Sequence, residues 1–341
     1  MEATPASQLS FKTHLGFLFY LGPYSGMRTL LSLFFTLPLL SFAAENRDLN
    51  FSTPCSSGND VAVVSVVGDI LIHDGIYSAI AAGKQDFSEI WRKVVPLFTK
   101  ADFSMANLEG PAALGIDVNG RDHGDVGFTY DKNIYSGTNF SFNYHPRILS
   151  DLKRSGIDLL TVANNHSLDR KAIGIDRTLE AASKINLPTV GARSSKDRSG
   201  EFHRIVNIQG LNVAVIGCTE MTNGNPDSAQ QLLWCYKNAS QIEATIRELK
   251  GRSDIHAILV YPHWGQEYSN NPDSSQRTYA RRFLDAGATA VIGSHPHVLQ
   301  PWEKYVTRDG RETLIAYSLG NFVAYQRGVD KKTGVVLYLG L

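Results

Sequence analysis

The chain has 341 residues, and its 33 Lys and Arg balance its 33 Asp and Glu, so the formal net charge is zero. With 43% hydrophobic and 19% charged residues it has the composition of a folded globular protein, which excludes disordered, low-complexity and collagen-like classes. The neutral balance also argues against nucleic acid as a partner, because phosphate backbones are bound by clustered Lys and Arg.

A leader is the first predicted element. An uncharged apolar run, Leu30–Ala44, follows Arg28 and ends in small residues, which is typical of a secretory signal peptide cleaved after Ala43. Residues 1–43 are therefore predicted to be removed on export to the periplasm or another extracytoplasmic space, and Met27 is the start that we expect for this leader. The alternative is an uncleaved membrane anchor, although the apolar run is shorter than the ~20 residues that span a bilayer.

A linker and one domain follow the leader. Residues 44–60 are polar and rich in Ser, Gly and Asn, whereas residues 61–341 carry the apolar runs of a folded domain. Three cysteines are too few for a disulfide scaffold. Cys218 lies at the end of an apolar run, where a small buried residue is its commoner role, and the sequence leaves a bridge to Cys235 open.

Strand-like and helix-like segments alternate along the domain. Short apolar runs rich in β-branched residues predict buried strands at Val61–Val67, Asp102–Ala106, Ile157–Ala163, Leu211–Ile216, His256–Tyr261, Ala288–Ile292 and Thr313–Tyr317. Amphipathic segments between them predict helices at Ser88–Lys100, Pro146–Ser155, Lys171–Lys184, Ser240–Lys250 and Ser274–Ala286. This alternation indicates an α/β fold with a largely parallel or mixed sheet. Residues 110–145 are irregular and aromatic, and a loop of this length in a compact domain is typically functional.

Polar side chains follow most of these predicted strands. Carboxylate, imidazole or amide residues come after the apolar runs at Asp69, Glu109, Asn165 with His166, His263, His295 with His297, and Asn321. In open α/β sheets ligands bind at the carboxyl ends of the strands, so we expect these side chains to share one site.

The residue types in this set point to a transition metal. Imidazole nitrogens with carboxylate and amide oxygens suit Zn, Mn, Fe or Ni, and the lack of matching cysteines excludes a thiolate site. His295 and His297 are two residues apart around Pro296, so an extended segment would direct both imidazoles to the same side. They would then enter one cavity or face two adjacent metals.

Each of these residues also has a non-functional interpretation. A lone histidine at a strand end is more often a hydrogen-bonded loop residue than a ligand. Asp69 after Gly68 suits a turn or a helix cap, and Glu109 suits a solvated loop. The coincidence of such residues at successive strand ends is what favours a shared polar site.

The motifs around these residues are specific in combination. They are VGDILIHDGIY (67–77), NLEGP (107–111), ANNHSLD (163–169), HWGQEY (263–268), GSHPHVLQ (293–300) and IAYSLGNFV (315–323). In these motifs the chain resembles the CapA, or poly-γ-glutamate capsule biosynthesis, family, a branch of the calcineurin-like metallophosphoesterase superfamily. The resemblance implies a metallophosphoesterase-like α/β sandwich, with central mixed sheets flanked by helices.

The resemblance also implies roles for the strand-end residues. It places metal ligands at Asp69, Glu109, Asn165, His263, His295 and His297, with Glu109 bridging, and a general acid or transition-state stabiliser at His166. One or two divalent ions (Mn, Fe or Zn) held there would clamp a phosphoryl group and lower the pKa of a bridging water.

Two positions depart from the superfamily pattern. The first block is usually Asp-x-His, but Leu71 stands where that histidine is expected, and His73 is a candidate substitute ligand. Glu109 stands where an Asp is usual, which adds a methylene to the reach of the carboxylate. One metal centre is therefore expected to be weak, mononuclear or differently built.

Two further residues have alternative roles beside the ligands. Asp169 is predicted to cap the helix that begins near Lys171 or, as the less favoured alternative, to orient His166. Glu267 would either orient His263 or remain a solvated loop charge.

Two functions fit these observations. One is an exported metal-dependent hydrolase acting on a phosphoester or another polar bond. The other is a non-catalytic component of capsule or poly-γ-glutamate assembly that handles an anionic polymer within a membrane capsule-synthesis complex. The strand-end residues favour hydrolysis as the chemistry of the site. The resemblance favours polymer assembly as the biological role.

Overall fold

The computed structural model of the chain describes residues 49–52 and 61–341. The predicted leader, its expected start at Met27 and most of the predicted linker lie outside these residues. Within them, no helix is both long and apolar enough to cross a membrane.

The described residues form two six-stranded sheets. The first has the order β11 (Asn321–Val323), β1 (Val63–Ile70), β2 (Phe103–Leu108), β3 (Leu159–Thr161) and β4 (Thr189–Val190). These neighbours are all parallel, and β12 (Leu337–Gly340) adds an antiparallel partner along the first half of β1.

The second sheet is mixed, with antiparallel strands at its two edges. Its order is β5 (His203–Ile208), β6 (Leu211–Thr219), β7 (Ala257–His263), β8 (Ala290–Ile292), β10 (Glu312–Ala316) and β9 (Trp302–Val306). The four central strands are parallel, so their carboxyl ends meet at one edge of the sheet.

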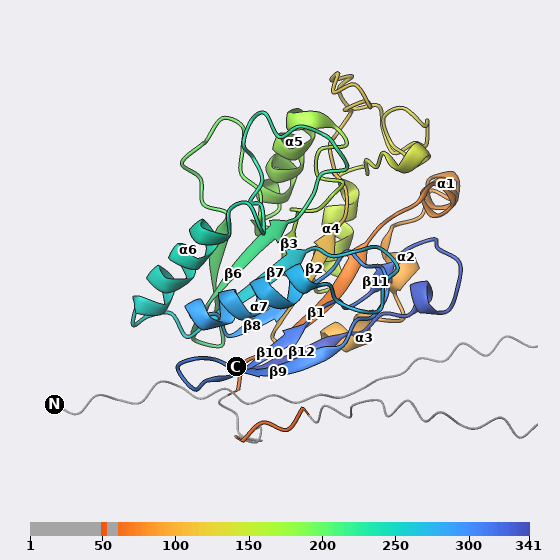
Figure 1. The fold of residues 1–341 in the computed structure, drawn as a ribbon. Coiled ribbons are helices and arrows are strands. Elements are labelled where there is room, and N and C mark those ends of the chain that lie inside the picture. The colour runs from red at the N-terminus through yellow and green to blue at the C-terminus, as the bar shows by residue number, and fades with distance from the viewer. Residues whose placement is uncertain (1–48, 53–60) are drawn as a thin grey trace, which may run out of the picture.

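Helices cover the outer faces of the two sheets (Figure 1). Side chains on the outer face of the first sheet pack with α1 (Asp74–Ala82), α2 (Ser88–Trp91), α3 (Val95–Phe98), α4 (Arg147–Arg154) and α5 (Lys171–Lys184). The outer face of the second sheet packs with α6 (Ala239–Gly251) and α7 (Ser274–Ala286), which lie side by side. The remaining elements are two single 3₁₀ turns, η1 (Thr138–Phe140) and η2 (Asp330–Lys332).

A third apolar cluster lies between the two sheets. It takes alternate residues from strands of both sheets, including Val64 and Val66 of β1 and Leu259 and Tyr261 of β7, all almost fully buried. Each buried side chain of this kind contributes roughly 1.5–3 kcal/mol by removal from water. The α/β sandwich expected from the resemblance is therefore confirmed, with the sheets face to face and the helices outside.

Most predicted elements are confirmed, and two helices have the predicted bounds. Lys171–Lys184 and Ser274–Ala286 appear unchanged as α5 and α7, and α7 begins with a capping box in which Asp273 and Gln276 bond reciprocally. The single helix predicted over Ser88–Lys100 is wrong, because the segment forms two separate turns, α2 and α3. Pro96 has no N–H to continue a helical ladder, and its ring clashes with the preceding turn.

A disulfide joins Cys218 and Cys235, the pairing that the sequence leaves open. Cys218 is in β6, and both cysteines are fully buried in the cluster under α6 and α7. The bridge therefore fastens the segment that precedes α6 to the sheet.

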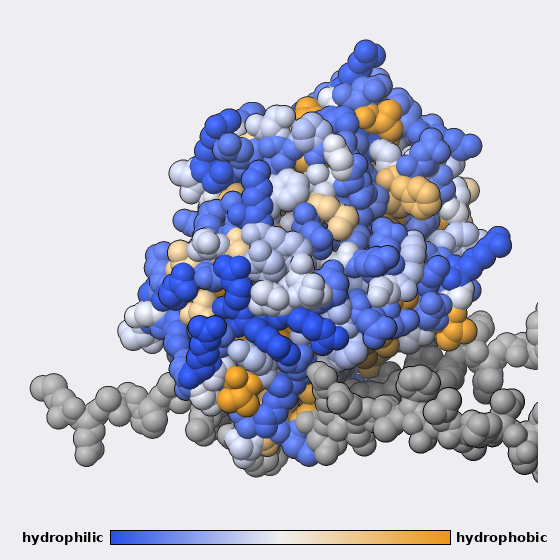
Figure 2. All heavy atoms as spheres, in the orientation of Figure 1, coloured by the Kyte–Doolittle hydropathy of each residue, from blue (hydrophilic) through white to orange (hydrophobic). Residues whose placement is uncertain are grey.

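The exposed surface is mostly hydrophilic on the face drawn in Figure 2, where apolar residues appear singly or in small groups. Scattered apolar residues of this kind are normal for a folded protein and do not mark a binding surface.

Candidate metal centre

A bulge in β1 determines the direction of Asp69. Val66 pairs with Met105 of β2, but the next partners are Asp69 and Asn107, so three steps along β1 match two along β2. The extra residue returns Asp69 to the face that looks toward the second sheet. Gly68 makes this possible, since a Cβ there would lie 1.9 Å from the carbonyl oxygen of Gly320.

Strand alternation brings two more side chains to the same place. Met105, Asn107 and Glu109 are spaced by two along and just beyond β2, so all three point between the sheets. From the second sheet, His263 is the last residue of β7 and lies two beyond Tyr261, a member of the inter-sheet cluster. The predicted site residues therefore meet at the carboxyl ends of strands from both sheets.

The His295–His297 segment is not extended, which corrects the prediction. Both histidines have left-handed backbones, with φ of 101° at His295 and 58° at His297. Both imidazoles still enter the site, and their ring centroids are 5.9 Å apart. The N–H of His295 donates to Asp69 Oδ2 at 3.1 Å, which helps to hold this unusual conformation. Non-glycine residues in this region are uncommon and cluster at functional sites.

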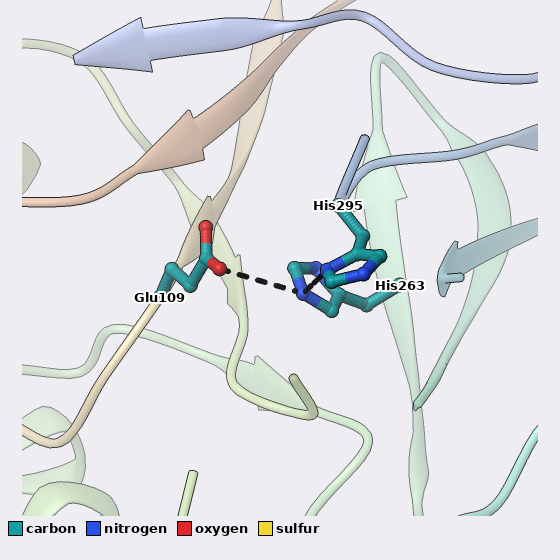
Figure 3. A group of neighbouring side chains, drawn as sticks. All are labelled: Glu109, His263 and His295. Atoms are coloured by element: carbon teal, nitrogen blue, oxygen red, sulfur yellow. Dashed lines mark hydrogen bonds and ion pairs between the residues drawn. The ribbon is translucent and has the colours of Figure 1, made fainter. Parts of the chain in front are cut away.

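Two groups of potential metal ligands share Glu109. Glu109, His263 and His295 form one group, and Asp69, Glu109 and His297 form the other; within each, the ligand atoms lie within 4.8 Å of one another. Figure 3 shows Glu109 facing His263 and His295 across the gap between the sheets. Glu109 Oε1 is 3.6 Å from His263 Nε2 and 3.7 Å from His297 Nε2. A carboxylate between two such groups is placed to bridge a pair of cations.

The surroundings of Glu109 show whether these side chains fit a metal ion. Both of its carboxylate oxygens are buried, and neither has a hydrogen-bond partner. Burial raises the pKa of Glu109 well above its usual range, with Asp69 and Glu267 adding to the rise and His297 opposing it. A buried carboxylate without hydrogen bonds is costly to ionise, and a bound cation would remove that cost. The donor set of imidazole and carboxylate fits Zn, Mn or Fe.

The imidazoles differ in their protonation. Burial and the neighbouring histidines hold the pKa of His263 well below its usual value, and burial together with His297 lowers the pKa of His295 to about 4. Both are therefore neutral, which is the form that ligates a metal. Burial also lowers the pKa of His297, but Glu109 and Asp69 outweigh it and raise the value to about 9.

Asp169 orients His166, which corrects the prediction of a helix cap. Its Oδ2 lies 2.8 Å from His166 Nδ1 and accepts the N–H of Phe142 at 2.7 Å, whereas α5 begins without a side-chain cap. The edge of the Phe142 ring packs on His166 at 4.7 Å between centroids. His166 is thereby fixed with Nε2 directed away from Asp169.

Asn165 lies beside the ligand groups, and Asn223 is a contact that sequence reasoning missed. Asn165 Oδ1 is 2.9 Å from His263 Nε2, and its Nδ2 donates to Asn223 Oδ1 at 3.3 Å. Asn223 Nδ2 lies 3.4 Å from His166 Nε2, so one exposed amide reaches two predicted site residues. No periodic signal identifies Asn223, because it lies in an irregular turn after β6.

Other amides and a hydroxyl hold the ligands in place. Asn107 Nδ2 donates to Asp69 Oδ1 at 2.7 Å and lies 3.2 Å from His263 Nδ1. Ser294 Oγ is 3.1 Å from the same nitrogen, and Asn321 Oδ1 is 2.9 Å from His297 Nδ1. Partners of this kind fix which ring nitrogen faces the metal. Asn107 lies two residues before Glu109 in an apolar strand, and that spacing is the signal that could have found it.

Two candidate residues are not brought into either ligand group. His73 stands at the N-cap position of α1 without a capping side-chain hydrogen bond, and its Nδ1 is 3.2 Å from both the carbonyl oxygen of Leu71 and the backbone nitrogen of Tyr325. Glu267 is exposed, so the solvated alternative describes it better than a contact that orients His263. Its charge nevertheless acts on Glu109 and His297.

Comparison with known proteins gives matches over most of the chain. The family model described as "Bacterial capsule synthesis protein PGA_cap" matches residues 63–326. "PGA biosynthesis protein CapA" of Bacillus subtilis is 32% identical over 78% of this chain and 64% of its own length. "Capsule biosynthesis protein CapA" of Bacillus anthracis is 30% identical over 78% of this chain and 60% of its own. The chain thus spans less than two thirds of the length of these relatives.

Solved structures give more distant matches. The structure of TT1561 of Thermus thermophilus is 12% identical, with a TM-score of 0.40 over 76% of this chain and 90% of that one. The sulfate thiohydrolase SoxB of Thermus thermophilus, in complex with glycerol, is also 12% identical, with a TM-score of 0.39 over 75% of this chain and 52% of that one.

Proposed function

Because the chain belongs to the bacterial capsule synthesis protein family PGA_cap, we propose that it is an exported component of capsule or poly-γ-glutamate synthesis with a metal-dependent hydrolase site. Among its relatives, CapA of Bacillus subtilis is a PGA biosynthesis protein, and a Mycobacterium tuberculosis protein is a probable polyglutamine synthesis accessory protein. The substrate is an anionic polymer or a phosphoester, and the partners are those of a membrane capsule-synthesis complex.

The observation that carries the hydrolase proposal is the buried carboxylate of Glu109, whose two oxygens accept no hydrogen bond. It lies buried between His263 and His295 on one side and Asp69 and His297 on the other. The proposed ligands are these five residues with Asn165. Divalent cations held there would polarise the scissile group and lower the pKa of a water enough to generate hydroxide at neutral pH.

The proposed acid is His166. Its Nδ1 is held by Asp169 at 2.8 Å, so the ring keeps one orientation while Nε2 faces the site. A proton on Nε2 would then be available to the leaving oxygen, while the buried carboxylate of Asp169 holds the ring in place. Asn223 Nδ2 lies 3.4 Å from the same nitrogen.

Export is supported by two independent features. The sequence pattern of residues 1–43 is that of a secretory leader. The disulfide between Cys218 and Cys235 is the kind of bond that persists in oxidising compartments. Export predicts a periplasmic or other extracytoplasmic protein.

The second candidate function is a polymer-handling protein that keeps the scaffold without turnover. Leu71, which stands at the expected histidine position of the first block, is apolar and 2% exposed, so it offers no ligand. Glu109 in place of Asp also changes the reach of the bridging carboxylate. These two positions are the observations that favour this alternative.

Metal analysis combined with an activity assay separates the two functions. We expect the purified protein to contain divalent metal and to hydrolyse a bis-aryl phosphate, and His263→Ala and His295→Ala to lose both properties. His256→Ala, which alters an exposed histidine immediately before β7, is the matched control. Circular dichroism checks that each variant is folded.

The two candidate functions predict different results in these assays. Bound metal without hydrolysis, together with loss of capsule in cells that carry the ligand variants, would support the polymer-handling function. A wild-type protein without bound metal, and capsule made normally by the ligand variants, would rule out the site itself.

A further inference from the structure

Cationic and aromatic side chains occur where Tyr268, next to His297, meets the loop that follows β11. The group comprises Tyr268 and four residues of the loop between β11 and β12, and we call it the cationic rim: Tyr268, Tyr325, Arg327, Lys331 and Lys332. Figure 1 shows this loop in blue where the chain leaves β11. No motif discussed above includes the loop residues.

Contacts with predicted ligands hold the cationic rim in place. Asn321, whose Oδ1 contacts His297, donates from Nδ2 to the carbonyl of Lys331 at 2.9 Å. The Lys331 ammonium lies 4.0 Å from the centroid of the Tyr268 ring, and that ring is 5.9 Å from the ring of His297. Two routes therefore connect Lys331 to His297, one through the backbone and one through stacked side chains. On the other side, the N–H of Tyr325 is bound to His73 Nδ1.

The charges of the cationic rim are not neutralised by the protein. Within residues 49–52 and 61–341, no carboxylate forms an ion pair with Arg327, Lys331 or Lys332, whereas Lys250 and Lys304 elsewhere are paired. Arg327 and Lys332 are exposed and Lys331 is half-buried. Tyr325 is 70% exposed, and Tyr268 is 44% exposed. These groups are free to bind a ligand from solution.

Two carboxylates near the cationic rim oppose its positive charge. Asp330 lies between the cations in sequence and is exposed. Glu267 is adjacent to Tyr268, and its negative charge raises the pKa of His297. Three cations against two anions leave a local excess of positive charge that the neutral chain as a whole does not have.

We propose that the cationic rim binds the side-chain carboxylates of a linear polyanion and guides the polymer to the metal centre, an inference that rests on the proposed function. Two of its three cations are lysines, which act as separate point charges and require no bidentate geometry from the ligand. The tyrosine rings offer flat surfaces on which the methylene groups of such a polymer can pack. A polymer with one carboxylate per unit matches cations spaced along a loop.

Binding of poly-γ-glutamate oligomers by the whole protein tests the proposal. The triple variant R327Q/K331Q/K332Q is expected to bind about tenfold more weakly, since each exposed charge contact contributes a factor of a few. The affinity of the wild type is expected to fall with rising salt more steeply than that of the variant. The matched control K84Q/K93Q/K100Q removes three exposed lysines around α1–α3 and is expected to bind like the wild type. Glu267→Gln is expected to bind more tightly.

Metal content and hydrolysis of a small aryl phosphate are measured in the same proteins, and oligomer binding is repeated after chelation. Weaker oligomer binding by the triple variant than by K84Q/K93Q/K100Q, with metal content retained, supports the proposal. Wild-type affinity in the triple variant would overturn it, as would equal binding of an uncharged amide derivative of the polymer or tighter binding of polyphosphate. If the hydrolase proposal fails, the wild-type protein will lack bound metal or will not turn over the aryl phosphate. Binding of the oligomer to the cationic rim will still be measurable in the chelated protein.

Discussion

Asp69, Glu109 and the three histidines at 263, 295 and 297 could be predicted from the sequence to meet, because each follows an apolar strand and the carboxyl ends of parallel strands share an edge. The residues that hold them could not all be found in this way. Asn107 and Ser294 lie in or beside apolar strand patterns, where a single polar residue looks like a tolerated exception. Their role depends on which residue of the other sheet they face, and only the packed structure specifies that.

The Asp169–His166 pair gives a prediction at the scale of single residues. Asp169→Asn can keep an oxygen toward His166 Nδ1 and the N–H of Phe142, but it removes the carboxylate that holds the ring of the proposed acid. We expect hydrolysis of a bis-aryl phosphate to fall by about ten- to a hundredfold, with metal content unchanged. Glu180→Gln on α5, which removes an exposed ion-paired carboxylate, should leave kcat unaltered. Full activity in Asp169→Asn would exclude His166 as the acid.

At the scale of elements, long amphipathic helices and buried central strands could be predicted well, and short or edge elements could not. The strands β4 and β11 have two and three residues, too few for a periodic pattern. The edge strand β5 is largely exposed, so its sequence lacks the apolar run that marks a buried strand. The bulge in β1 is likewise invisible in the sequence, because it is defined by the register with β2.

The bulge in β1 gives a prediction at the scale of elements. In Gly68→Ala the new Cβ would approach the carbonyl oxygen of Gly320, so β1 or β11 must move and Asp69 must move with it. We expect a loss of about 1–3 kcal/mol in the free energy of unfolding, as for overpacked cores, together with reduced metal affinity. Urea unfolding and metal titration measure the two effects. In Gly251→Ala, where nothing lies within 4 Å of the new Cβ, neither effect is expected. Unchanged metal affinity in Gly68→Ala would mean that the bulge does not position Asp69.

At the scale of the whole molecule, the alternation of strands and helices in the sequence predicts the α/β class. The family resemblance predicts the two-sheet sandwich. The neutral composition argues against nucleic acid as a partner, yet Arg327, Lys331 and Lys332 place three positive charges on one loop of the neutral chain. The sum of charges contains no information about their placement.

The disulfide gives a prediction about the compartment. If the chain is exported, protein isolated from the periplasm and denatured without reductant should have Cys218 and Cys235 unreactive toward a thiol reagent, and both should react after reduction. Cys218→Ala should lower the free energy of unfolding by about 3 kcal/mol, because 17 residues separate the two cysteines. Unfolding by urea with and without reductant measures the effect. Reaction of Cys218 and Cys235 in the unreduced protein would contradict export to an oxidising compartment.

The position of the site between the sheets links metal binding to the stability of the whole fold. Asp69 and Glu109 come from the first sheet and His263 from the second, with His295 and His297 just beyond β8, so a bound cation cross-links both halves of the sandwich. A ligand that binds only the folded state stabilises it by about 2.7 kcal/mol at a free concentration of 100 times its Kd. We therefore expect chelation to lower the Tm by about 5 °C and added Zn or Mn to restore it. The Tm of His263→Ala should be as low as that of the chelated wild type, whether or not chelator is present. The Tm of His256→Ala should respond to chelation as the wild type does. A Tm that is independent of metal in the wild type would show that no cation joins the two sheets.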